Sequence, residues 1–161
     1  MPEVTGPPLS RRLQARFFRV VNVPMRVVLG LPLATPLGRN LMLAFVIGRR
    51  SGKTYRQPVS YVRDGDALLT PGGGKWKLNL VVGTPVRLRL RGRDMLATPE
   101  LVSDLDEVGR LLQTMAAGNP AASRFVGIQR GADGSFDRGG VERAVQYGFR
   151  IVRWHPVGQS W

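Results

Sequence analysis

The sequence predicts a single α+β domain built on a small antiparallel barrel or half-barrel of about six strands. Three observations support this fold class. The 161 residues are enough for one domain with a sizeable core. Short apolar runs bounded by glycine and proline turns, which are typical of strands, fill much of the chain after residue 40. Two or three segments with helical periodicity accompany them, and strands with a few segregated helices indicate an α+β fold.

We expect residues 1–9, which are rich in proline, to be disordered, and residues 10–161 to form the domain. Within the segment 10–30, the stretch Arg11–Val23 predicts an amphipathic basic helix. Such a helix either packs on the core or contacts an anionic membrane surface. The stretch Phe17–Leu43 contains too many arginines and prolines to span a membrane, and the apolar segment after the early arginines is too irregular for a convincing signal peptide.

The predicted strands follow one another with short connections. In chain order they are Leu41–Ile47, Arg56–Val62, Asp66–Thr70, Val86–Arg91, Asp94–Val102 and Ala144–Pro156. The fourth alternates most clearly, with Val86, Leu88 and Leu90 inward and Arg87, Arg89 and Arg91 outward. A helix is expected from the N-cap Asp104 to Ala117, where Gly118-Asn119-Pro120 ends it.

The composition excludes several kinds of site. The chain has no cysteine, which excludes disulfides, zinc–thiolate sites, iron–sulfur clusters and cysteine nucleophiles and fits a reducing cytoplasm. His155 is the single histidine, so sites that need two imidazoles are excluded, and we expect this residue to be structural. No metal site is predicted.

The net charge of +13 predicts attraction to a polyanion, such as nucleic acid, an anionic membrane or an acidic cofactor. The arginines are spread along the chain, and no zinc finger, basic zipper or RNA-recognition signature is present. We therefore expect no nucleic-acid partner.

The most informative segment is the basic turn, which we define as Gly48–Pro58 and which reads GRRSGKTYRQP. It combines four cations with several free backbone amides, a combination that suits a phosphate or a polycarboxylate. A nucleotide P-loop is excluded because the spacing of its glycines is wrong and because the β-prone Tyr55–Pro58 follows where a helix is required. The alternative is an ordinary solvated hairpin loop.

A second glycine cluster, Pro71-Gly-Gly-Gly-Lys-Trp76, follows the third predicted strand and opens a short helix expected over Lys75–Val82. Its glycines expose backbone amides without side-chain obstruction. Two basic glycine turns at the same end of a barrel could hold opposite parts of one anionic ligand.

The order of these motifs resembles the deazaflavin-dependent nitroreductase family, which includes quinone reductases and has the flavin-reductase-like split β-barrel fold. The similar residues are Gly48-Arg-Arg-Ser-Gly52, Pro58, Tyr61-x-Arg-Asp-Gly65, the glycine cluster, Trp76-x-x-Asn79-Leu80 and Pro85, within about Leu41–Val102. The resemblance implies a split β-barrel of about six mostly antiparallel strands with two to three flanking helices.

The resemblance also implies coenzyme F420, a deazaflavin whose tail carries a phosphate and a polyglutamate chain. The residues implied for the phosphate and tail are Arg49, Arg50, Ser51, Gly52, Lys53 and Arg56. Those implied along the cofactor are Gly72, Gly73, Gly74 and Lys75, with Trp76 and Asn79 fixing that wall. The implied reaction is hydride transfer between the deazaflavin and an apolar, electron-poor acceptor such as a quinone or an enone.

Candidate proton donors are Tyr61, Tyr55 and Ser60, among which the sequence does not choose; Tyr61 also suits the barrel core. The family usually has arginine where Tyr55 stands, and this chain has no tyrosine between Met95 and Gly140, which argues against nitroimidazole reduction. Two alternatives are open: an FMN-dependent oxidoreductase of the same fold, and a non-catalytic barrel that binds a lipid or polyanion. A cytoplasmic location, with the inner membrane face as an alternative, and either a monomer or a homodimer are expected.

Overall fold

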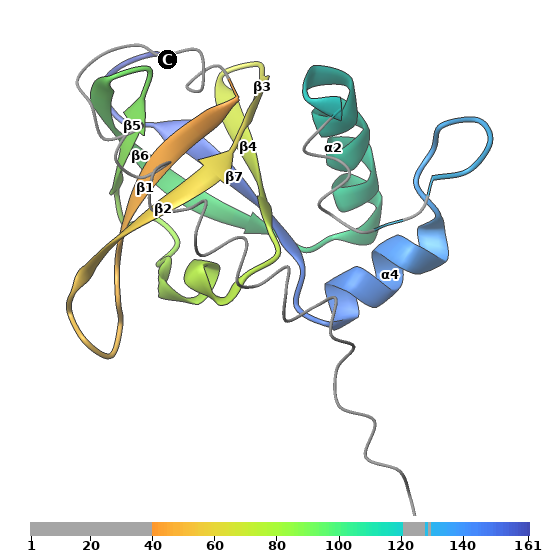
Figure 1. Ribbon diagram of the computed structural model, residues 1–161, viewed down its shortest axis with the longest axis horizontal. Helices are drawn as coiled ribbons and strands as arrows, with labels where there is room; N and C mark the ends of the chain where they lie inside the picture. The colour runs from red at the N-terminus through yellow and green to blue at the C-terminus, as the bar shows by residue number, and fades with distance from the viewer. Residues whose placement is uncertain (1–39, 121–127, 129) are drawn as a thin grey trace, which may run out of the picture.

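The computed structural model describes residues 40–120, 128 and 130–161. These residues form a curled, seven-stranded antiparallel sheet with two α-helices and one short 3-10 helix (Figure 1). The predicted α+β split-barrel class is therefore confirmed. The tail 1–9 and the segment 10–30, for which a basic helix was predicted, lie outside the described residues. No helix in the described ranges is long and apolar enough to cross a membrane.

The strands run in the order β2-β1-β5-β6-β7-β4-β3 across the sheet. They are β1 (Leu41–Ile47), β2 (Thr54–Ser60), β3 (Val62–Asp64), β4 (Ala67–Gly72), β5 (Val86–Leu90), β6 (Arg93–Val102) and β7 (Arg150–Pro156). Every neighbouring pair is antiparallel. Five of the six predicted strands match an observed strand within two residues at each end.

A single residue joins the two outermost strands of the sheet. β2 ends at Ser60 and β3 begins at Val62, yet these strands occupy opposite ends of the strand order. The chain therefore crosses from one edge to the other at Tyr61, whose amide donates to the carbonyl of Asn40 (3.1 Å). The prediction of one strand over Arg56–Val62 is wrong here, because the bend lets the sheet curl onto itself. β2 also contacts β4, which closes the barrel.

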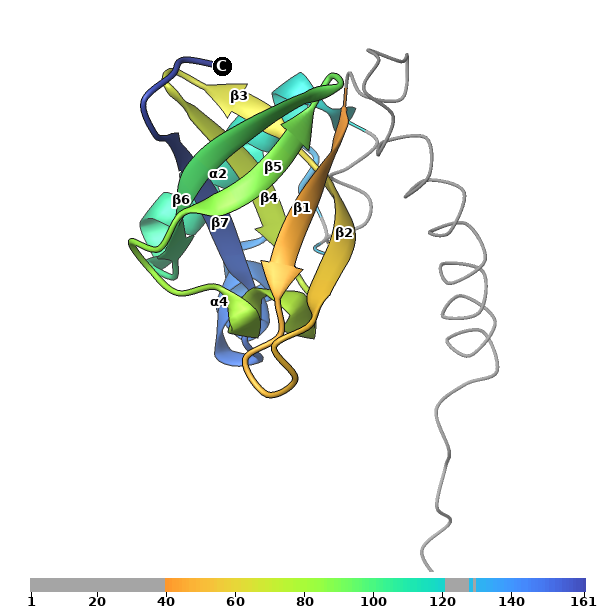
Figure 2. The same cartoon turned by 90° about the vertical axis from the view of Figure 1, so that its left-hand side faces the viewer.

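The antiparallel register gives the barrel two distinct ends. The loop Gly48–Lys53 connects β1 to β2 at one end. β1 pairs with β5, with Leu43 opposite Arg89, so the turn Arg91–Gly92 between β5 and β6 lies at the other end. Figure 2 shows these two connections at the bottom and the top of the barrel. Arg91 therefore lies in a turn rather than on the outward face of a strand, which corrects the prediction for this residue.

Helix α2 (Leu105–Gly118) begins where the sequence predicts. The Asp104 carboxylate accepts from the amide of Glu107 (2.9 Å), as an N-cap does, and Asn119 ends the helix. The helix lies beside the sheet (Figure 1), and its apolar stripe packs in one cluster with residues of β4, β6 and β7. Its buried members are Val108, Leu111, Leu112, Met115 and Ala116.

The last predicted strand, Ala144–Pro156, is partly wrong because its first part is helical. Helix α4 (Arg138–Gln146) begins after Asp137, whose carboxylate accepts from an amide of the first turn (2.7 Å). β7 starts only after Gly148, whose positive φ of 96° reverses the chain direction. Tyr147, which lies within this predicted strand, is 90% exposed. The helix cap at Asp137 and the chain reversal at Gly148 therefore decide the local structure, against the period-two apolar pattern that predicted a strand.

The core has two large clusters, one on each face of the sheet, and a third, smaller cluster of Leu43 and Phe45 on β1. In β4 and β7, residues of one parity point into the barrel, and those of the other parity pack with α2 and α4. In β4, Leu68 packs inside the barrel and Leu69 packs outside it, and in β7 Trp154 and Ile151 divide in the same way. The indole of Trp154, which is fully buried, donates to the Thr70 hydroxyl (3.1 Å).

An ion-pair network fastens α2 to the sheet. Arg153 of β7 contacts Glu100 of β6 (3.0 Å) and also Glu107 of α2, which in turn accepts two hydrogen bonds from Arg110 (2.8 and 3.0 Å). These bonds, first those from Arg110 and then the one from Arg153, lower the pKa of Glu107 to about 2. His155 joins the network through Glu100 (2.7 Å), which agrees with its expected structural role.

We expect Glu107→Gln to lower the free energy of unfolding by about 1 kcal/mol at pH 7, since the carboxylate is partly exposed. Because the pKa of Glu107 is depressed in the folded protein, its contribution is present above about pH 4.5 and is lost as pH falls through about 2. Urea unfolding of both proteins at pH 7 and at pH 2.5 measures this difference. A difference in stability that stays constant between the two pH values would contradict the prediction.

Candidate functional site

The connection between β1 and β2 is held together mainly by its own atoms. The amide of Gly52 donates to the carbonyl of Gly48, and the amide of Gly48 donates to that of Lys53, both at 2.8 Å. Gly52 has a φ of +66°, a conformation that disfavours side chains. The Ser51 hydroxyl lies 3.1 Å from the Tyr55 hydroxyl and accepts from the amide of Lys53 (3.3 Å). Ser51 and Tyr55 therefore shape the turn.

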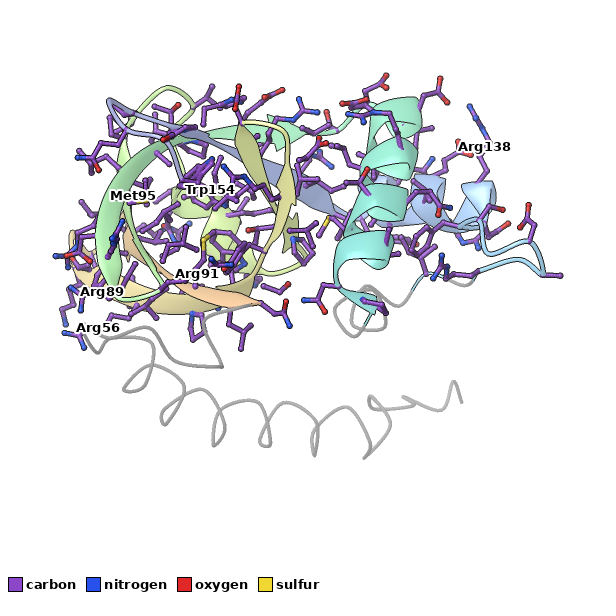
Figure 3. All side chains as sticks on the ribbon, turned by 90° about the horizontal axis from the view of Figure 1, so that it is seen from above. Arg56, Arg89, Arg91, Met95, Arg138 and Trp154 are labelled. Carbon is purple, nitrogen blue, oxygen red and sulfur yellow. The ribbon has the colours of Figure 1, made fainter. Side chains whose placement is uncertain are left out.

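The cations of the basic turn are exposed and unpaired. Arg49, Arg50, Lys53 and Arg56 form no ion pair with any carboxylate among the described residues. Figure 3 shows Arg56 outside the ring of strands. Because no protein carboxylate neutralises these charges, the turn suits an anion from outside the protein.

Fewer backbone amides are free in this turn than the sequence suggests. Of the amides from Gly48 to Lys53, those of Arg50 and Ser51 alone lack an acceptor within the described part of the chain. An anion at this turn would therefore be held mainly by side chains, with these two amides in support.

The glycine cluster leads into a 3-10 helix, η2 (Lys75–Asn79), rather than the longer helix expected over Lys75–Val82. The helix stops because Leu80 turns to an extended conformation and buries its side chain in the barrel core. Trp76 is half-buried against the same core, while Lys75 is exposed. The 3-10 helix thus presents Lys75 to solvent and anchors itself through its apolar residues.

One hydrogen bond joins the two turns. The amide of Arg49 donates to Asn79 Oδ1 (3.1 Å), and Asn79 Nδ2 donates to the carbonyl of Trp76 (3.3 Å). The structure therefore brings the basic turn and the glycine cluster together at one end of the barrel, as the sequence analysis expected. Asn79 acts as the connection between them.

Lys77 lies at this candidate site but was not among the site residues predicted from the sequence. Its side chain is buried, and its ammonium donates to the carbonyl of Gly74 (2.7 Å). Burial, and next the charge of Arg150, lower the pKa of Lys77. The spacing of three residues between Gly74 and Lys77 is the one local signal for this contact, and it is too common to be diagnostic. Through this hydrogen bond, Lys77 holds the glycine cluster in position.

The three glycines of the cluster differ in their surroundings. A Cβ on Gly72 would lie 2.7 Å from the carbonyl oxygen of Arg150 and 3.1 Å from the Lys77 side chain. Gly72 is therefore required by the close pairing of β4 with β7. Gly73 has open space around it, and both Gly73 and Gly74 are exposed, so these two form the accessible part of the cluster.

The three candidate proton donors lie at opposite ends of β2. Tyr55 lies beside the basic turn, where a Cβ on Gly48 would meet its ring at 2.6 Å. Ser60 and Tyr61 lie at the far end of the strand, about 20 Å away at the usual rise of a β-strand. Tyr61 is buried, which matches its expected place in the barrel core. Within the residues that the structure describes, no cluster of acidic residues and histidine could hold a metal.

Residues 11–132 match the model of the F420H(2)-dependent quinone reductase family. This chain belongs to that family. The match confirms the resemblance seen in the sequence and covers both glycine turns. An F420H(2)-dependent quinone reductase is an F420-dependent oxidoreductase, and nothing in the match points to FMN. None of the curated protein sequences matches this chain.

Solved structures resemble this family member in fold. A domain-swapped dimer is 11% identical, covers 85% of this chain and 98% of its own, and superposes with a TM-score of 0.53. HutZ, the heme storage protein from Vibrio cholerae, is 12% identical over 76% and 85% of the two chains, with a TM-score of 0.48. A Listeria innocua protein provisionally named a pyridoxamine 5′-phosphate oxidase is 11% identical over 76% and 86%, also at 0.48. At these identities the likeness concerns the fold alone.

Proposed function

We propose that this chain reduces quinones with F420H2 and that its basic turn holds the anionic tail of the cofactor. The observation that carries the proposal is the hydrogen bond from Arg49 to Asn79, which places unpaired exposed cations beside an open glycine cluster. The tail of F420 carries a phosphate and glutamate carboxylates. Its charge therefore complements the cations of the turn.

The residues present fit such a tail. Arg49, Arg50 and Lys53 supply charge-assisted hydrogen bonds from exposed positions, and the free amides of Arg50 and Ser51 add two donors. Arg56 extends the positive surface along β2. The internal hydrogen bonds of Ser51 keep the turn rigid, which limits the entropy lost on binding.

The second turn would support the same ligand. Gly73 leaves room for close approach, and Lys75 adds an exposed cation nearby. Asn79 and Lys77 hold the backbone of this turn in place through Arg49 and Gly74. When bound, F420H2 supplies a hydride, which with one proton converts a quinone to a hydroquinone. The chain's part is to bind and orient.

Titration of the full chain with F420 tests this proposal. We expect saturable quenching of tryptophan fluorescence, weaker at high salt because the contacts are ionic, and no matching response to FMN. Oxidation of F420H2 by a soluble quinone, followed by the absorbance of F420, should then depend on the protein. Saturable binding of FMN with no response to F420 would contradict the proposal.

A further inference from the structure

The end of the barrel opposite the basic turn contains a cavity of about 840 Å³. Tyr61, Leu68 and Leu90, all buried, line it together with half-buried Met95 and Trp161. The volume lies within the range of small-molecule binding sites. The Trp161 indole donates to the carbonyl of residue 66 (2.8 Å), which fixes the chain terminus at the cavity wall. The floor of the cavity is therefore apolar and aromatic.

The carboxylate at this cavity is already neutralised. Asp94 accepts from Arg89 Nε (2.6 Å) and Nη2 (2.9 Å) and also pairs with Arg87 (3.5 Å). The hydrogen bond from Arg89 is the first cause that lowers the pKa of Asp94. Asp94 is thus committed to the two arginines of β5 and leaves the other cations of the cavity uncompensated.

Three further arginines line the same cavity. Arg63 donates to a backbone carbonyl two residues away (3.4 Å). The guanidinium groups of Arg91 and Arg93 form no hydrogen bond or ion pair with any residue in the described ranges. Two unpaired guanidinium groups therefore lie at the mouth of an apolar cavity. Their positive charge is complementary to a carboxylate.

Arg91 also has an unusual backbone. Its φ is +49°, and within the described residues it is the one non-glycine residue with a positive φ. With Gly92 at +79° it forms the two-residue connection of β5 and β6, where asparagine before glycine is the usual choice. Figure 3 looks into this end of the barrel and shows Arg91 within the ring of strands. A strained residue whose side chain lies at a cavity is typical of a functional site.

We propose that this cavity binds an amphipathic carboxylate, with its apolar body against Leu68 and Leu90 and its carboxylate at Arg91 and Arg93. The site is separate from the loop Gly48–Lys53 of the basic turn, because the two lie at opposite ends of β2, about 20 Å apart. The proposal thus goes beyond the proposed quinone reductase activity, and its test requires no F420.

Calorimetric titration of the full chain with decanoate and with 1-decanol tests the proposal. Decanoate should bind about tenfold more tightly than the alcohol, because only the carboxylate engages the two arginines. The double variant Arg91→Asn/Arg93→Gln should lose about tenfold in decanoate affinity and change little toward decanol. The double variant Arg138→Gln/Arg143→Gln, which removes the same charge from exposed positions on α4, is the matched control and should bind decanoate as the wild type does.

A second measurement separates binding from folding. Arg91→Asn alone should raise the thermal midpoint by about 2 °C, because asparagine tolerates the left-handed conformation, while it weakens decanoate binding. A more stable protein with a weaker site excludes misfolding as the cause. Absence of decanoate binding to the wild type, equal affinity for decanoate and decanol, or full affinity in the double variant would each overturn the proposal.

Discussion

We expect the double variant Arg50→Glu/Lys53→Glu to bind F420 at least about a hundredfold more weakly than the wild type. Both side chains are exposed and unpaired, so their reversal removes two charge-assisted contacts and adds repulsion from the tail. Neither side chain makes a contact that holds the turn, since the internal hydrogen bonds there use Ser51, Gly52 and backbone atoms. The fold should therefore survive both reversals.

A control of equal charge change distinguishes a local site from general attraction to a basic protein. Arg138→Glu/Arg143→Glu makes the same change in net charge on α4, away from the turn. This control should retain F420 affinity within about threefold, because exposed charges beyond a Debye length are screened at physiological salt. Fluorescence titration at two salt concentrations measures both variants. Equal losses in the two double variants would show that the turn is not the tail site.

The second large effect concerns Gly72, where we expect Gly72→Ala to lower the free energy of unfolding by about 2 kcal/mol. The added Cβ would lie 2.7 Å from the backbone carbonyl of Arg150, which the β4–β7 pairing holds in place. Removing this clash requires the two strands to move apart, and overpacking of this kind is destabilising. The same change should weaken F420 binding, because Gly73 and Gly74 continue from this strand.

Gly73→Ala is the matched control for this prediction. No heavy atom lies within 4 Å of a Cβ at Gly73, so this change should alter stability by less than about 0.5 kcal/mol. Urea unfolding at pH 7 compares the two variants directly. Equal stability of Gly72→Ala and Gly73→Ala would contradict the strand-pairing argument.

Local patterns in the sequence were sufficient to predict several helices and strands. Asp104 and the apolar stripe after it predicted α2, because a cap and a helical period act within one turn of chain. The alternation of Leu88 and Leu90 with arginines predicted β5 and its inward face. The last residues of α4, Ala144–Gln146, were predicted as strand because an apolar alternation there continues into β7, although the cap at Asp137 starts a helix that includes them.

Contacts between segments far apart in the sequence decided the remaining features of the fold and of the candidate site. The bend at Tyr61 depends on the pairing of β2 with β1 and of β3 with β4, which no short window of sequence contains. The bond from Arg49 to Asn79 joins residues 30 apart, and it decides how many amides of the basic turn are free. The site residues implied by the family resemblance are predictions that a binding measurement tests.

The sequence by itself determined the fold class, the positive turn and the family, because composition, capping and turn chemistry act over a few residues. Only the tertiary structure decided that the two glycine turns meet, that Lys77 supports one of them and that Arg91 lies at a cavity. These features depend on the register of antiparallel strands. A strand places its neighbours by hydrogen bonds to segments far away in the chain, so the end of the barrel at which a residue lies is a property of the whole sheet.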